Sequence, residues 1–141
     1  MDDDVGFRKW LGIQYRDVSD SRAVVALPLD DAKRNIRGVA HGGIIASLLD
    51  IAMGTAASGG TYQTRTRLVV TLELKLNYLA PGSGDELVAI AEVVRNGGRT
   101  LVTLCNVFTD SGEICATGSG TFIVRKPHKN DPPRLRQRQI D

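Results

Sequence analysis

The sequence predicts an α+β fold in which an antiparallel β-sheet curves around one long, almost uncharged helix. Two observations predict this class: a series of short strand patterns with tight turns, and a single apolar segment at residues 42–60 that interrupts them. With 141 residues, the chain can bury one hydrophobic core without a disulfide or a structural metal. We therefore expect one folded domain, residues 1–124, which includes a short N-terminal helix.

A short helix and two strands open the predicted domain. Phe7, Trp10 and Leu11 are spaced to lie on one face of a first helix. Residues 12–20 and 21–30 then favour two strands joined at a Ser-Asp-Ser turn.

A helix of about four turns is predicted to begin at Gly42. Apolar residues recur at helical spacing on one face, and the opposite face carries small residues and Asp50, the only charged residue between positions 42 and 60. A helix of this kind is covered on all sides, which suits a central position inside a curved sheet with another chain or backbone close by. The apolar stripe consists of Ile44, Ile45, Leu48, Leu49, Ala52 and Ala56.

Four strands are predicted after the helix, and the first has the clearest pattern. From Leu68 to Tyr78 the even-numbered residues are apolar and most odd-numbered ones are polar, so the even set is expected to face the core. Glycine-containing turns separate three further strands, at 85–95, 99–108 and 113–124. These short connections favour an antiparallel meander, because parallel strands need longer crossovers.

The formal net charge of +2 is unevenly distributed. Residues 125–141 contain six Lys or Arg and two Asp, which predicts a basic, disordered C-terminal tail or, less favoured, a weak contact with anionic surfaces or partner subunits. Without a leader pattern or a membrane-length apolar run, a cytoplasmic protein with no nucleic-acid or membrane partner is expected.

Cys105 and Cys115 are spaced neither as metal ligands nor as a disulfide framework, and reduced, packed thiols are expected.

The presence of Asp50 in an apolar helix needs a physical explanation, because burying an ionised carboxylate costs several kcal/mol unless it is paired or hydrogen-bonded. Three reasons remain open: a structural bond to a neighbouring backbone group or Arg, an exposed helix face, or a carboxylate made more reactive by its removal from water.

The residues before the helix favour the reactive carboxylate. His41-Gly42-Gly43 places side-chain-free residues at the first turn, where amide N–H groups lack intrahelical partners and the helix dipole is positive. Glycine lets a ligand approach the backbone closely, and such donors suit a carbonyl oxygen that gains negative charge during acyl transfer. Asp50 lies about two and a half turns further on, too far to act on the same carbonyl within one chain.

A motif of six residues before and within the helix, followed by the strand that ends in "LNYLAP" and the hairpin "NGGRTL", resembles the hotdog-fold acyl-CoA thioesterases. The six residues are Asn35, Gly38, His41, Gly42, Gly43 and Asp50. The resemblance covers about residues 11–124 and is strongest to the branch that includes phenylacetyl-CoA and 4-hydroxybenzoyl-CoA thioesterases. It implies a hotdog fold, homodimers or homotetramers with sites at the dimer interface, and hydrolysis of acyl-CoA to free acid and CoA. No metal or organic cofactor is implied, since CoA is part of the substrate.

The resemblance also implies roles for individual residues. The Gly42 N–H would polarise the thioester carbonyl, and Asp50 of the partner chain would activate water or attack the carbonyl itself. Asn35 and His41 would position the water or the thioester, and Thr71 matches a residue that orients the water in some members. His41 as the catalytic base is a competing interpretation, since its imidazole titrates near neutral pH.

Substrate binding is assigned to the helix start and to the hairpin. Gly43 would lie against the thioester, and the hairpin would hold the CoA phosphates, although solvated charges at a hairpin tip explain its arginines equally well. The hairpin residues are Arg95, Gly97, Gly98 and Arg99.

Two other functions stay open. One is a non-catalytic acyl-CoA binding or sensing module, and the other is a hotdog-fold dehydratase, which would act on enoyl or hydroxyacyl substrates without thiol release.

Overall fold

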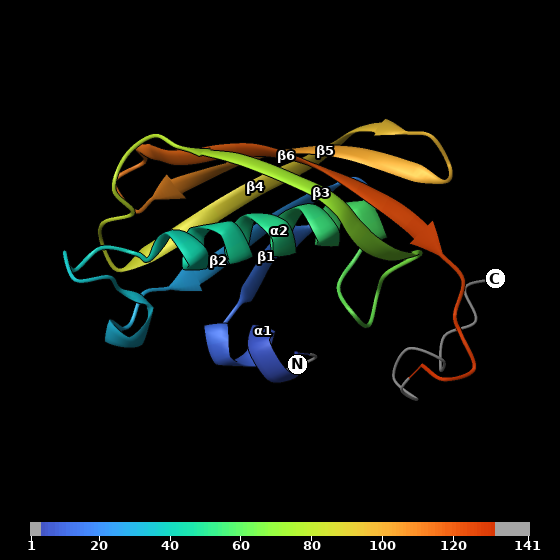
Figure 1. The fold of residues 1–141 in the computed structure, drawn as a ribbon, viewed down its shortest axis with the longest axis horizontal. Helices are drawn as coiled ribbons and strands as arrows, with labels where there is room; N and C mark the ends of the chain where they lie inside the picture. The colour runs from blue at the N-terminus through green and yellow to red at the C-terminus, as the bar shows by residue number, and fades with distance from the viewer. Residues whose placement is uncertain (1–3, 132–141) are drawn as a thin grey trace.

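The computed structural model describes residues 4–131, which form two α-helices, one short 3-10 helix and six strands (Figure 1). In chain order the elements are α1 (Gly6–Leu11), β1 (Gln14–Val18), β2 (Arg22–Pro28), η1 (Asp31–Lys33), α2 (Gly42–Ser58), β3 (Leu68–Tyr78), β4 (Glu86–Asn96), β5 (Thr100–Thr109) and β6 (Ile114–Arg125).

One antiparallel sheet contains all six strands in the order β1-β2-β4-β5-β6-β3. The sheet arches over α2, which lies against its concave face, and α1 lies below (Figure 1). The predicted α+β class with a central helix is therefore confirmed. The predicted meander holds only for β4, β5 and β6, because β3 pairs with β6 at one edge of the sheet and not with β4.

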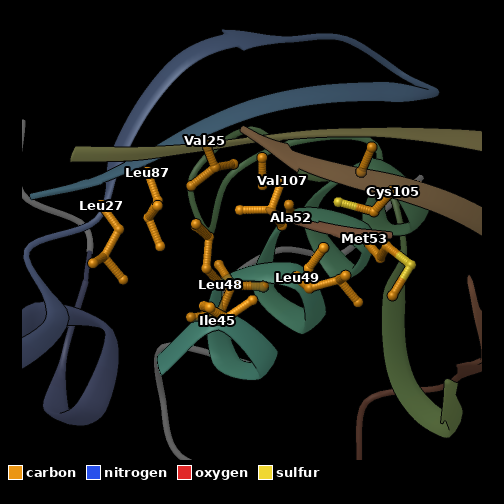
Figure 2. Close-up of a cluster of buried hydrophobic side chains, with 14 of the residues drawn as sticks. Val25, Leu27, Ile45, Leu48, Leu49, Ala52, Met53, Leu87, Cys105 and Val107 are labelled. Carbon is orange, nitrogen blue, oxygen red and sulfur yellow. The ribbon is translucent and has the colours of Figure 1, made fainter. Parts of the chain in front are cut away.

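The core lies between α2 and the sheet. The predicted apolar stripe of α2 is buried, and Leu48 and Leu49 have no exposed surface. They face strand residues such as Val25, Leu87 and Val107 (Figure 2). Because each fully buried side chain of this size contributes about 1.5–3 kcal/mol, the stripe fixes the helix on the sheet.

The predicted core face of β3 is wrong for Val70 and Leu72, whose side chains are 45% and 58% exposed. A β-bulge between Thr71 and Glu73 shifts the register of β3 against β6. One extra residue reverses the alternation of side chains, so the odd-numbered residues before the bulge and the even-numbered ones after it face the helix. The residues that face α2 in this way are Val69, Thr71, Leu74 and Leu76.

The side chains at the two ends of the described chain make contacts that the sequence patterns do not reveal. In α1 only Leu11 is buried, while Phe7 and Trp10 stack on each other at the surface with 6.1 Å between ring centroids. At the other end, Arg125 makes a bidentate pair with Asp131, at 3.0 and 3.1 Å. Residues 132–141 of the predicted tail lie outside the described residues.

Both cysteines are buried and free, as predicted. Burial raises the pKa of the Cys105 thiol to about 12 and also raises the pKa of Cys115. Among residues 4–131, neither helix is long and apolar enough to cross a membrane.

Candidate active site

Asp50 lies in the middle of α2 with its side chain half-buried. The Thr71 hydroxyl donates a hydrogen bond to Asp50 Oδ1 at 2.9 Å. Thr71 reaches the carboxylate because the bulge in β3 leaves it on the helix side of the strand. One oxygen of Asp50 is therefore held in place by a neutral donor, and the second oxygen remains as an acceptor.

The start of α2 is capped by His41. Its Nδ1 accepts from the Gly43 N–H at 2.9 Å, and its carbonyl accepts from Ile44 and Ile45. Since Nδ1 is an acceptor, the neutral ring carries its proton on Nε2. This arrangement caps the helix with His41 and occupies the lone pair of its basic nitrogen, Nδ1, with the Gly43 N–H, which disfavours His41 as a catalytic base.

Gly42 is the first residue of α2, and within residues 4–131 its N–H has no acceptor. Tyr78, at the end of β3, donates to the Gly42 carbonyl at 2.7 Å. A Cβ at Gly42 would stand 3.1 Å from the Tyr78 hydroxyl oxygen. Glycine at this position therefore permits the close approach of Tyr78 and keeps an N–H available at the positive end of the helix.

Gly42 and Asp50 do not meet within one chain. Asp50 follows Gly42 by eight residues, which corresponds to about 12 Å along the axis. The geometry of the single chain thus separates a potential carbonyl-binding group from the potential base.

Asn35 lies in the loop before α2. Its side-chain Oδ1 accepts from the Arg37 N–H at 2.9 Å, and its backbone carbonyl accepts from Gly38. The side-chain oxygen is thus used to shape the loop, and the amide nitrogen is the remaining donor.

The predicted phosphate-binding residues lie in the turn between β4 and β5. The Gly98 N–H donates to the Asn96 side chain at 2.9 Å, and Gly98 has a φ of +83°. Arg95 and Arg99 are exposed, and neither lines the cleft that contains Asp50.

A cleft of about 260 Å³ runs along the second half of α2 from Asp50 and Thr71. Gly54 and Ser58 line its helix side, and Phe122 lies on the sheet side. Its far end is formed by arginines and Tyr62, none of which was predicted as a site residue. The sequence offers only "TRTR" at 64–67 as an indication of this cationic end, because the other arginines come from α1 and β6.

Comparison with known proteins identifies the family. A family model described as "Thioesterase superfamily" matches residues 37–116. The chain is 29% identical over 99 residues to the medium/long-chain acyl-CoA thioesterase YigI of Escherichia coli, and the match covers 62% of this chain and 64% of that protein. The match therefore spans less than two thirds of this curated relative.

Two solved structures have the same fold. The BH2602 protein of Bacillus halodurans, solved with CoA, is 37% identical with a TM-score of 0.72, and the match covers 84% of this chain and 74% of that one. The PaaI protein of the E. coli phenylacetic acid degradation operon is 26% identical with a TM-score of 0.76, covering 84% and 83% of the two chains. The family model, the relatives and the six-stranded sheet around one central helix agree that this chain belongs to the hotdog-fold thioesterase superfamily.

Proposed function

We propose that the protein hydrolyses acyl-CoA thioesters to the free acid and CoA. The observation that carries this proposal is the Asp50 carboxylate, held by Thr71 in a cleft beside α2. Family membership supports the reaction class, and the acyl-CoA thioesterase named above supports the substrate class.

The proposed site is shared between two subunits, with Gly42 from one chain and Asp50 from the other. The open edge of β3 supports this arrangement, because an edge of eleven residues is a long unpaired template for a second strand. Exposed apolar side chains lie on or next to this strand, which suits burial against a second copy: Val70, Leu72, Tyr78 and Leu79. A homodimer, alone or paired into a tetramer, is the proposed assembly.

In the proposed reaction, the Gly42 N–H and the helix dipole stabilise negative charge on the thioester oxygen. Asp50 of the partner removes a proton from water, whose oxygen forms a bond to the carbonyl carbon. The carbon–sulfur bond then breaks, and the thiolate takes up the proton. Direct attack by Asp50, followed by hydrolysis of the resulting anhydride, gives the same products.

The remaining predicted residues complete the proposal. Asn35 and His41 position the reacting groups, and Gly43 lies beside the thioester. Exposure of Arg95 and Arg99 at the β4–β5 turn supports a contact with the CoA phosphates, where Gly97 and Gly98 allow close approach.

Release of thiol from a panel of acyl-CoA and acyl-carrier-protein thioesters tests this function, with Asp50→Asn as the critical variant. We expect the variant to lose about a hundredfold or more in kcat, the scale of removing a general base. Asp17→Asn is a matched control, because Asp17 is exposed on β1 and pairs with Arg22.

Three results would contradict the proposal. The first is wild-type turnover by Asp50→Asn on the best substrate. The second is binding of acyl-CoA by the wild type without turnover, which would indicate a sensing module. The third is conversion of enoyl or hydroxyacyl substrates without thiol release, which would indicate a dehydratase.

A further inference from the structure

The peptide unit between Gly42 and Gly43, in the first turn of α2, is held by side chains at both of its polar ends. The Tyr78 hydroxyl donates to its carbonyl oxygen at 2.7 Å, and its N–H donates to His41 Nδ1 at 2.9 Å. The preceding peptide unit is fixed as well, because the His41 carbonyl accepts hydrogen bonds from two helix amides, at 2.9 and 3.2 Å. The Gly42 N–H belongs to that preceding unit and therefore has a defined direction.

Tyr78 can hold this turn because its own backbone is fixed by the sheet. It is the last residue of β3 and pairs with Ala116 of β6, and the next two amides, of Leu79 and Ala80, donate to the Cys115 carbonyl at 2.9 and 3.3 Å. The hydroxyl thus connects the end of an edge strand to the start of a helix that lies 36 residues earlier in the chain. A hydrogen bond from a side chain that is itself anchored limits the movement of the group that accepts it.

The ring of Tyr78 also lies against the backbone of Gly42. A Cβ at Gly42 would stand 3.1 Å from the hydroxyl oxygen of Tyr78, 3.3 Å from its Cζ and 3.5 Å from its Cε1. The ring therefore occupies the side of Gly42 that a side chain would otherwise fill, and it limits movement of the first turn in that direction. Tyr78 is 55% exposed, so this contact does not result from burial in the core.

The same strand holds the other half of the proposed shared site. Thr71, in the first half of β3, bonds to Asp50, and Tyr78, at its end, bonds to Gly42. In an antiparallel pair of two β3 edges related by a two-fold axis, the end of one strand lies beside the first half of the other. Gly42 of one chain would then approach Asp50 of its partner. An anchor between Gly42 and β3 thus sets the position of the N–H relative to the strand that would pair with the partner.

We propose that Tyr78 is a positioning residue of the hydrolase: its hydroxyl orients the first turn of α2 so that the Gly42 N–H faces the thioester oxygen. This inference rests on the proposed function. In this role Tyr78 does not touch the reacting atoms and acts through Gly42. An N–H donor stabilises a developing oxyanion only when it is directed at that oxygen, so a loosened turn weakens binding of the transition state more than binding of the substrate.

Tyr78→Phe tests this role, because it keeps the ring and removes the hydroxyl. We expect kcat for the best acyl-CoA substrate to fall about tenfold while KM changes by about twofold or less, since a small displacement of a group that acts on the reacting atoms lowers the rate strongly. Light scattering should give the same mass as for the wild type. Calorimetry should show equally tight substrate binding by Asp50→Asn and by the double variant Asp50→Asn/Tyr78→Phe.

A control and a local measurement separate this role from a general loss of stability. Tyr15→Phe is the matched control, because it also removes a hydrogen-bonded phenol hydroxyl, one that bonds to Arg8 and Asp4. It should lower the melting temperature and leave kcat unchanged. Amide hydrogen exchange, followed by NMR, reports on the turn itself. In Tyr78→Phe the Gly43 N–H should exchange about fivefold faster than in the wild type, while the amides of β5 keep their wild-type rates.

Failure of the inference differs from failure of the proposed function. Wild-type kcat in Tyr78→Phe, or unchanged exchange of the Gly43 N–H, would overturn the inference and leave the hydrolase intact. A raised KM with unchanged kcat would make Tyr78 a wall of the substrate site, and dissociation into monomers would make it an interface residue, so either result also overturns the inference. Absence of thiol release from every thioester would overturn the hydrolase and, with it, the inference.

Discussion

The Thr71 hydroxyl donates a hydrogen bond to the Asp50 carboxylate and so joins a candidate site residue of β3 to one of α2. A hydrogen bond from a neutral donor to a carboxylate fixes its orientation and leaves its charge in place. Asp50 thus belongs to α2, and its carboxylate is oriented by a hydrogen bond from β3. The role we assign to Thr71 is to hold this carboxylate toward the reacting carbonyl or water.

Replacing Thr71 tests that role. Thr71→Val keeps the shape of the side chain but removes the donor, and a hydrogen bond to a charged group is worth about 1.5–3 kcal/mol. We expect kcat to fall about tenfold or more with little change in KM, and Thr71→Ser to retain most activity. Thr117→Val is the matched control, because Thr117 bonds to Asn106 away from the cleft. Equal kinetics for Thr71→Val and the wild type would exclude the assigned role.

At the scale of the element, α2 combines a packed stripe with a face of small residues. Gly54 lies one turn after Asp50 and lines the cleft, and a Cβ there would stand 3.4 Å from Phe122 Cε1, an ordinary contact. Glycine inside a helix is less favourable than alanine by about 1 kcal/mol. The glycine therefore weakens the helix but widens the cleft.

Gly54→Ala is expected to stabilise the fold and narrow the cleft. The melting temperature should rise by about 3 °C, and phenylacetyl-CoA turnover should fall more than acetyl-CoA turnover. Gly59→Ala is the contrasting variant, since Gly59 ends α2 with a φ of +73° and a Cβ there would be strained. A lower melting temperature for Gly54→Ala, or equal loss with both substrates, would contradict this explanation.

The same two elements illustrate what sequence can predict. The start of α2 follows from His41-Gly42-Gly43 and its stripe from helical periodicity, and both were predicted correctly. The inward side of β3 was not, because a bulge at Leu72 depends on pairing with β6, and alternation along one strand does not reveal it. Thr71 was therefore expected on the polar face although it reaches Asp50.

The contacts of the site that were not predicted join residues far apart in the sequence. Tyr78 reaches Gly42 across 36 residues, and Arg8 meets Tyr62 only because α1 packs near the end of the cleft. No local pattern encodes either contact. The separation of Gly42 and Asp50 could be predicted, since helical rise alone determines it, whereas their meeting across two chains stays a prediction.

For the whole molecule, the proposed shared site predicts complementation between two inactive variants. Asp50→Asn lacks the base, and Gly42→Pro lacks the N–H. The backbone of a first helical position accepts proline, and the proline Cβ, 3.1 Å from the Tyr78 hydroxyl oxygen, requires the Tyr78 side chain to shift by a few tenths of an ångström. His41 precedes it with φ −61° and ψ 141°, a conformation that suits a residue before proline. In a mixed dimer, one of the two sites combines the intact Gly42 and the intact Asp50.

Co-expression of the two variants in equal amounts measures this effect. Random pairing gives half mixed dimers, each with one intact site of two, so about one quarter of wild-type thiol release is expected. Each variant alone should be inactive but folded, by circular dichroism, and the wild type should have at least the mass of a dimer by light scattering. A fully active monomer, or a mixture as inactive as its components, would place both groups in one chain.

The burial of both cysteines has a chemical consequence for the proposed reaction. Each turnover would release a free thiol, and the oxidised form of that thiol can form mixed disulfides with accessible thiolates on proteins. Cys105 and Cys115 are buried, and burial raises the pKa of both, to about 12 for Cys105. At neutral pH they are protonated and inaccessible, so the protein is resistant to covalent modification by its own product.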